Sequence, residues 1–178
     1  MSFATSSFST SLGFLPVIAA SGILVAGVVD DFRSRKVHNV LFLICAAVAL
    51  VVAVAVGGWE ALYLAPVGFM AGIAVFLPLV ILKVVGAGDM KLMAAFGIVA
   101  GWNAVLTVAV FALIWGAIFG LVQVTLKGQL LGTLKNMLAI ASMKNRQPVE
   151  LHKMPFTVAI LMGWLSHLTT SGVFGGVL

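Results

Sequence analysis

Two acidic sites stand out in an apolar chain of 178 residues. The first is Asp89, which follows two glycines in the run GAGDMK at positions 86–91. The second is the pair Asp30 and Asp31, which ends another apolar run. An ionisable side chain is costly within a bilayer and usually serves a function there. Two carboxyl groups at one membrane face could form a catalytic pair, in which an ionised group activates a water molecule and a protonated group polarises a peptide carbonyl.

The composition assigns the chain to a broad class of protein. Hydrophobic residues make up 62% of it, charged residues make up 8%, and the mean hydropathy is +1.22. These values exclude a water-soluble domain and indicate a polytopic membrane protein. No Pro/Ser-rich linker or charged block is large enough to mark a second domain, so we predict one membrane-embedded domain over residues 1–178. The single cysteine, Cys45, excludes an internal disulfide and a CxxC zinc site.

The apolar segments predict the number of membrane crossings. A membrane helix needs roughly 20 residues, whereas the longest segment, 92–126, would be about 52 Å long as one helix in a hydrocarbon core of about 30 Å. We therefore expect this segment to break near Gly101. The prediction is an all-α transmembrane bundle of about six membrane helices. The apolar segments are 12–29, 40–59, 61–82, 92–126 and 154–178.

The positive charges predict the orientation of the bundle. With six crossings and the N-terminus outside, all ten Lys and Arg residues fall on one side, which is the cytoplasm by the positive-inside rule. With five crossings, the basic segment 127–153 would lie opposite the other charges. The six-helix arrangement also brings both acidic sites to the cytoplasmic face, where we predict the active site. The basic residues on this side are Arg33, Arg35, Lys36, Lys83, Lys91, Lys127, Lys135, Lys144, Arg146 and Lys153.

The cytoplasmic loop at residues 127–153 has a helical pattern of apolar residues. Leu131, Leu134, Leu138 and Ala141 lie at helical spacing with polar residues between them, which predicts an amphipathic helix on the membrane surface. The net charge of +5 does not indicate nucleic acid, because the basic residues border membrane helices and no nucleic-acid-binding motif accompanies them. Membrane lipid is the expected partner of these charges.

Two motifs of the chain resemble those of a known family. The run DFRSRKVHN, from Asp31 to Asn39, and the run GAGDMK at 86–91 resemble the active-site motifs of type IV prepilin peptidases, which are GxGD membrane aspartyl proteases. The resemblance is closest to the short form that serves Tad, or Flp, pili. In that family the spacing of the first motif selects Asp31 over Asp30, and the lysine that closely follows GxGD selects Asp89.

A third, softer match contains departures from the family pattern. The run MPFTVAI at 154–160 resembles the Pro-Tyr-Gly-x-Ala-Ile opening of the family's last membrane helix, but Phe156 and Thr157 stand where tyrosine and glycine are usual. In the first motif, His38 stands where proline is usual. These changes leave the acidic pair intact and bear on the substrate side of the site.

The resemblance implies an activity, a location and a set of site residues. The enzyme would be an aspartic endopeptidase that cleaves the leader peptide of Flp-like prepilins at the cytoplasmic face of the bacterial inner membrane. It would use no metal and no cofactor, and it would lack the N-methyltransferase activity of longer relatives. The implied catalytic residues are Asp31 and Asp89, and the implied supporting residues are Gly86, Gly88, Lys91 and Asn39.

Other functions fit the same acidic residues. Asp89 could be a helix cap, and Asp30 and Asp31 could form solvated pairs with nearby basic residues. A proton- or cation-coupled transporter or channel would also use acids in a membrane, although no polar path leads from them toward Glu60. A noncatalytic pilus-assembly subunit is a third candidate. If the pair is catalytic, helix dipoles favour Asp89, at a helix N-terminus, as the base and Asp31, at a helix C-terminus, as the acid.

Overall fold

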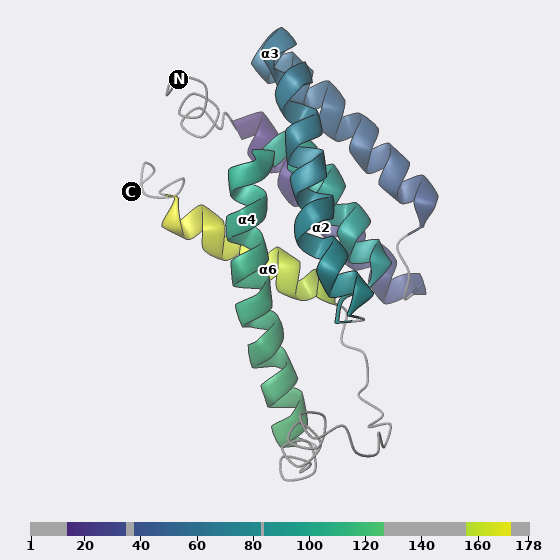
Figure 1. Ribbon diagram of the computed structural model, residues 1–178, viewed down its shortest axis with the longest axis vertical. Helices are drawn as coiled ribbons and strands as arrows, with labels where there is room; N and C mark the ends of the chain where they lie inside the picture. Colours follow the sequence, from purple (N-terminus) through teal and green to yellow (C-terminus); the bar gives the residue numbers. More distant parts are fainter. Residues whose placement is uncertain (1–13, 35–37, 83, 127–155, 172–178) are drawn as a thin grey trace.

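The computed structural model describes residues 14–34, 38–82, 84–126 and 156–171, and the amphipathic helix expected at 127–153 lies outside them. Within the described residues, all regular secondary structure is helical (Figure 1). The all-α class that the composition predicts is therefore confirmed. The helices are α2 (Phe14–Ser34), α3 (Asn39–Ile81), α4 (Ala87–Leu126) and α6 (Phe156–Thr170).

Helix α3 is interrupted at Gly58, where the chain turns back. Gly58 has φ 60° and ψ −148°, a conformation that glycine adopts at little cost and other residues rarely adopt. A straight helix of 43 residues would be about 64 Å long, roughly twice the hydrocarbon thickness of a bilayer. The interruption instead makes two arms, residues 39–57 and 59–81, that are about 28 Å and about 35 Å long. Figure 1 shows these arms meeting at one end of the bundle.

Helix α4 is interrupted in the same way at Gly101. This residue has φ 81° and ψ 166°, which again requires glycine. The arm before it, residues 87–100, is about 20 Å long, and the arm after it, residues 102–126, is about 37 Å long. The break that segment length predicts near Gly101 is therefore confirmed. Figure 1 shows the second arm turning back from the first and extending past the other helices.

The first arm of α4 lies at the centre of the bundle. Every residue from 92 to 100 is buried, and Met93 and Phe96 are completely so. A helix that is apolar on all sides needs other helices around it. Here α2 packs against Leu92, α3 packs against Gly97, and α6 packs against Phe96.

Small residues bring the second arm of α3 to within backbone contact of this central arm. A Cβ atom added to Gly68 would collide with the carbonyl group of Gly97, and one added to Gly97 would collide with that of Gly68. One helical turn along, a Cβ on Gly72 would lie 2.5 Å from the carbonyl oxygen of Met93. The spacing of Gly68 and Gly72 is the small-xxx-small pattern that lets membrane helices pack closely. The contact sets the position of α4 along α3.

Helix α6 crosses the second arm of α4 and reaches α2. Gly163 permits the crossing, because a Cβ there would lie 2.8 Å from the carbonyl oxygen of Val108 and from the backbone nitrogen of Ala112. The indole N–H of Trp164 donates a 2.9 Å hydrogen bond to the hydroxyl of Ser21 on α2. These contacts fix α6 against both of its neighbours.

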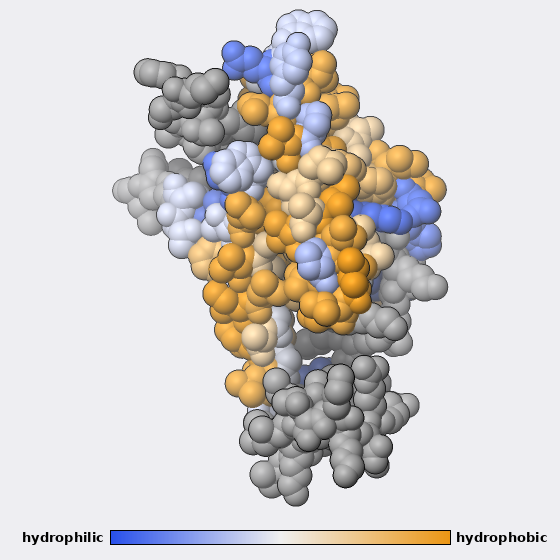
Figure 2. Space-filling view, viewed as in Figure 1, coloured by the Kyte–Doolittle hydropathy of each residue, from blue (hydrophilic) through white to orange (hydrophobic). Residues whose placement is uncertain are grey.

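Large apolar side chains cover the outside of the bundle. Val51, Tyr63 and Leu126 are 68%, 76% and 82% exposed, and Figure 2 shows hydrophobic residues over much of the described surface in view. An apolar surface of this extent suits contact with lipid and would be unfavourable in water. Among the described helices, three are long and apolar enough to cross a membrane: α2, α3 and α4. These features describe a membrane protein.

We expect Gly68→Ala to destabilise the bundle by about 1–3 kcal/mol, because the added methyl group forces the backbones of Gly68 and Gly97 apart. Thermal unfolding in detergent micelles would report a lower midpoint for this variant. Gly22→Ala is the matched control, since a Cβ on Gly22 meets no described atom within 4 Å. A Gly68→Ala protein as stable as the Gly22→Ala protein would contradict the close helix contact.

Candidate active site

Two helix ends bring the acidic residues together. On α2, Asp31 lies one turn after Gly27, and on α4, Asp89 lies about one turn before Leu92. A Cβ on Gly27 would lie 2.5 Å from a methyl carbon of Leu92, so the two helices are closely packed at this level. For antiparallel helices this contact sets Asp31 opposite Asp89. The Asp31 carboxyl group is close enough to act electrostatically on Asp89.

Asp89 is held by the turn that begins α4. It is only 7% exposed, and its Oδ2 atom accepts a 3.2 Å hydrogen bond from the backbone N–H of Gly86. The Gly86 carbonyl in turn accepts a 3.1 Å hydrogen bond from the N–H of Asp89. A side chain that bonds back to the residue before its helix is the acidic half of a capping box. Asp89 thus contributes to the cap of α4 from the first turn and is not the N-cap residue itself, and this hydrogen bond does not explain why Asp89 lies buried beside Asp31.

The glycines of the motif border the Asp89 carboxyl group. A Cβ on Gly86 would lie 3.3 Å from Oδ2 of Asp89, so a larger residue would crowd this oxygen. Gly88 lies in the first turn of α4, immediately before Asp89. The backbone before Asp89 therefore carries no side chain at either position.

Asp31 receives a hydrogen bond from a third helix. The hydroxyl group of Thr157, in the first turn of α6, donates to Oδ2 of Asp31 at 2.9 Å. Thr157 is completely buried, whereas Asp31 is partly exposed. The two residues are 126 positions apart, and the sequence marks Thr157 only as a departure from a family pattern. In the sequence, the only indication of this contact is a hydroxyl-bearing residue near the start of the last apolar segment.

Asp30 has a different partner from Asp31. Its Oδ2 atom accepts a 2.9 Å hydrogen bond from the backbone N–H of His38, and its Oδ1 atom lies 3.0 Å from Nδ1 of the same residue. His38 is the N-cap of α3, so the pair ties the end of α2 to the start of α3. A proline at this position would have no N–H to donate. Of the two adjacent carboxyl groups, that of Asp30 therefore connects α2 to α3, and that of Asp31 contacts α6.

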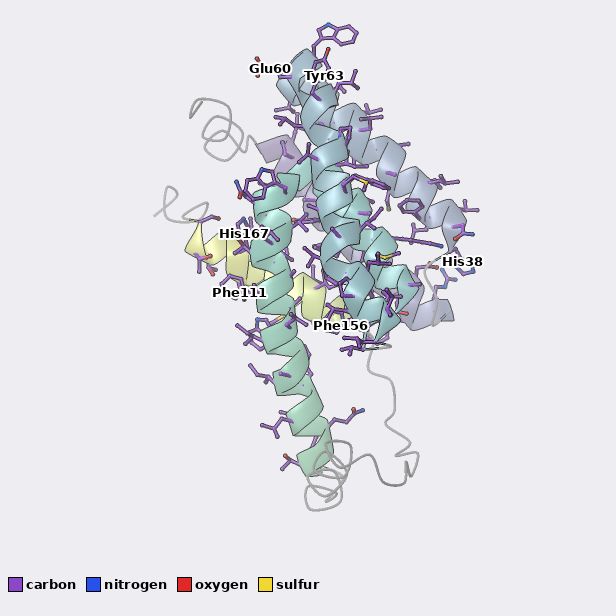
Figure 3. All side chains as sticks on the ribbon, viewed as in Figure 1. His38, Glu60, Tyr63, Phe111, Phe156 and His167 are labelled. Carbon is purple, nitrogen blue, oxygen red and sulfur yellow. The ribbon has the colours of Figure 1, made fainter. Side chains whose placement is uncertain are left out.

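Lys91 and Asn39 connect the starts of α4 and α3. The Lys91 ammonium group donates a 2.7 Å hydrogen bond to Oδ1 of Asn39. Lys91 lies two positions after Asp89, which is about 200° around the helix, so it emerges on another side of α4. Two of the supporting residues implied by the family motifs are thus in direct contact. Figure 3 shows His38, the neighbour of Asn39, far from the end of the bundle that carries Glu60 and Tyr63.

Three helix ends surround the acidic pair, and their dipoles act on it. The N-terminus of a helix carries a partial positive charge, and α4 and α6 bring such ends to Asp89 and Asp31 respectively. The expectation that Asp89 is the base and Asp31 the acid considers only α2 and α4. Because α6 offsets the effect of α2 at Asp31, and burial opposes the effect of α4 at Asp89, this assignment of roles stays a prediction.

The described groups at the site are two carboxyl groups with hydrogen-bond donors around them. Within the residues that the structure describes, no three His, Cys, Asp or Glu side chains gather closely enough to hold a metal ion. A pair of neighbouring carboxyl groups can transfer protons to and from a water molecule and a substrate. This is the chemistry that the arrangement offers.

Comparisons with known proteins identify the family of this chain. The model of the type IV leader peptidase family, a protease family, matches residues 18–121, which are more than half of the sequence. The matched region contains Asp31, Asn39, Asp89 and Lys91 and ends before α6. Searches of curated proteins and of solved structures gave no match. A match of this extent, across both of the helix ends that bear the acidic pair, shows that the chain belongs to the type IV leader peptidase family.

Proposed function

We propose that the protein is an aspartic endopeptidase that removes the leader peptide of Flp-like prepilins, with Asp31 and Asp89 as its catalytic pair. Membership of the leader peptidase family supports the reaction. The observation that carries the residue assignment is the burial of Asp89 at the start of α4, which packs at Gly27 and Leu92 against the end of α2 that bears Asp31. The resemblance of both motifs to those of the short peptidases favours an Flp-type substrate.

The proposed reaction is the hydrolysis of one peptide bond. One carboxylate accepts a proton from water as the water oxygen attacks the scissile carbonyl carbon. The other carboxyl group is protonated and gives its proton to the carbonyl oxygen, which stabilises the charge that develops there. When the tetrahedral intermediate collapses, the proton taken from water passes to the leaving amine, and the hydroxyl proton returns to the second carboxyl group. The pair thus ends in its starting protonation state.

The remaining proposed site residues act on the substrate side. Gly86 and Gly88 place no side chain on the backbone beside Asp89, where we propose that an extended substrate strand lies. Lys91, held by Asn39, supplies a positive charge near the site. We propose that Lys91 binds an acidic residue of the prepilin. We propose peptidase activity alone, without N-methyltransferase activity.

We assign the acidic site to the cytoplasmic face of the bacterial inner membrane. With the arms of α3 and α4 counted separately, the described chain has six helical segments, which is the number that six crossings need; α6 and the first arm of α4 are shorter than the other four. Arg33 and Lys91 lie close to the acidic residues in the chain, whereas Glu60 and Tyr63 lie at the far end (Figure 3). The positive-inside rule favours the cytoplasm for the acidic end. The shared core of these helices also supports one domain over residues 1–178.

Asp31→Asn and Asp89→Asn are each expected to lower cleavage by about 10³-fold or more, because an amide replaces neither the base nor the acid of the pair. Cleavage is measured by gel shift of a tagged Flp-type prepilin that is co-expressed with the enzyme in membranes. Asp30→Asn is the matched control, since the Asp30 carboxyl group is hydrogen-bonded to His38. We expect this control to retain cleavage.

Normal accumulation of the Asp31→Asn and Asp89→Asn proteins together with full cleavage would show that the catalytic assignment is wrong. A proton- or cation-coupled transporter would then become the leading function for the same residues.

The orientation is tested by labelling with a membrane-impermeant maleimide. We expect Glu60→Cys to be labelled in intact spheroplasts, and Arg33→Cys to be labelled only after permeabilisation, since the two residues flank opposite ends of the proposed crossings. The wild-type protein is the control, because its one cysteine, Cys45, is 6% exposed. Labelling of Arg33→Cys in intact spheroplasts would reverse the orientation.

Lys91→Gln is expected to raise KM for prepilin cleavage about two- to fivefold with little change in kcat, because the lost charge binds substrate and takes no part in the chemistry. Steady-state kinetics of the purified enzyme with a tagged prepilin measure both constants. Lys91→Arg keeps the charge and should remain close to wild type. A fall in kcat at unchanged KM would instead mean that Lys91 supports the acidic pair through Asn39.

A further inference from the structure

Thr157 is placed to control the orientation of the Asp31 side chain. Its hydroxyl group lies 2.9 Å from Oδ2 of Asp31, and the threonine has no exposed surface. A hydroxyl group that donates to one carboxyl oxygen restricts the rotation of that carboxyl group. The second oxygen of Asp31 is then presented in one direction, as proton transfer to or from a bound water requires.

Contacts elsewhere on α6 hold Thr157 in this position independently of Asp31. The neighbouring ring of Phe156 packs edge-on against Phe76 of α3, with centroids 6.4 Å apart, and fills the space over Gly116. Two turns along α6, the ring of Trp164 packs edge-on against Phe96 of α4, with centroids 5.1 Å apart. The threonine is therefore fixed by the packing of its helix, and Asp31 can adapt to it.

A purely structural account of the same hydrogen bond is available. A buried hydroxyl group needs a partner, and Asp31 could simply satisfy Thr157. In that case loss of the hydroxyl would affect the packing of α6 and not the chemistry. The two accounts differ in what they predict for kcat and for the response to serine, which keeps the hydroxyl.

We propose that Thr157 is a positioning residue for Asp31, which makes α6 the third helix of the active site. The proposal rests on the function proposed above, in which Asp31 is catalytic. Thr157 lies outside residues 18–121, the region that matches the family. In this chain, cleavage thus depends on a hydroxyl group that the two acidic motifs do not contain.

The test compares purified full-length variants by the steady-state cleavage of a tagged Flp-type prepilin. Thr157→Val keeps the shape of the side chain and removes the hydroxyl, and we expect it to lower kcat roughly 10- to 100-fold at nearly constant KM. Thr157→Ser restores the donor and should recover kcat to within about threefold of wild type. Ser21→Ala is the matched control, because it removes another α2–α6 hydrogen bond away from the acidic pair and should leave kcat unchanged.

Each outcome decides for or against the positioning role. Wild-type kcat in Thr157→Val overturns it, as does an equal loss in the valine and serine variants or in Thr157→Val and Ser21→Ala. If the valine protein does not accumulate, Thr157→Ala takes its place under the same criteria. The Asp31→Asn and Asp89→Asn proteins are assayed in parallel. Full cleavage by those two would refute the proposed function itself, whereas their inactivity beside an active Thr157→Val refutes the positioning role alone.

Discussion

The backbone contact between α3 and α4 holds the acidic site in place. Where Gly68 meets Gly97, no side chain separates the two helices, so their spacing is set by the contact of peptide groups. Membrane helices gain little from the hydrophobic effect on one another, because lipid is also apolar, and close packing has to provide their specificity. The contact carries the first turn of α4, with Asp89, to the level at which α2 ends with Asp31.

The site itself is a junction of helix ends, each with a different task. The two acidic residues at the end of α2 have different partners. Asp30 is hydrogen-bonded to His38 at the start of α3, and Asp31 is hydrogen-bonded to Thr157 of α6. The start of α4 supplies Asp89 together with the N–H group that bonds to it. The start of α6 supplies the hydroxyl of Thr157. Helix ends suit this purpose, because their free backbone groups and partial charges are available to polar side chains where a helix interior offers none.

Much of the scaffold could be predicted from the sequence. The apolar composition predicts membrane helices, and the excessive length of the segment 92–126 predicts a break near Gly101, because a helix rises by a constant amount per residue and a bilayer has a limited thickness. The two acidic motifs likewise identify Asp31 and Asp89 as a candidate pair. These predictions depend on local composition and spacing, which the chain carries within each segment.

The packing of the helices brings the candidate residues into contact in ways that no single segment reveals. The bond from Thr157 to Asp31 joins positions 126 apart, and the bond from Lys91 to Asn39 joins positions 52 apart. Neither follows from periodicity, because the angle and depth at which helices cross depend on the packing of all the intervening side chains. Composition and local spacing are enough to predict an all-helical membrane protein with two acidic motifs. Packing decided which oxygen of Asp31 receives a hydrogen bond, and from which helix.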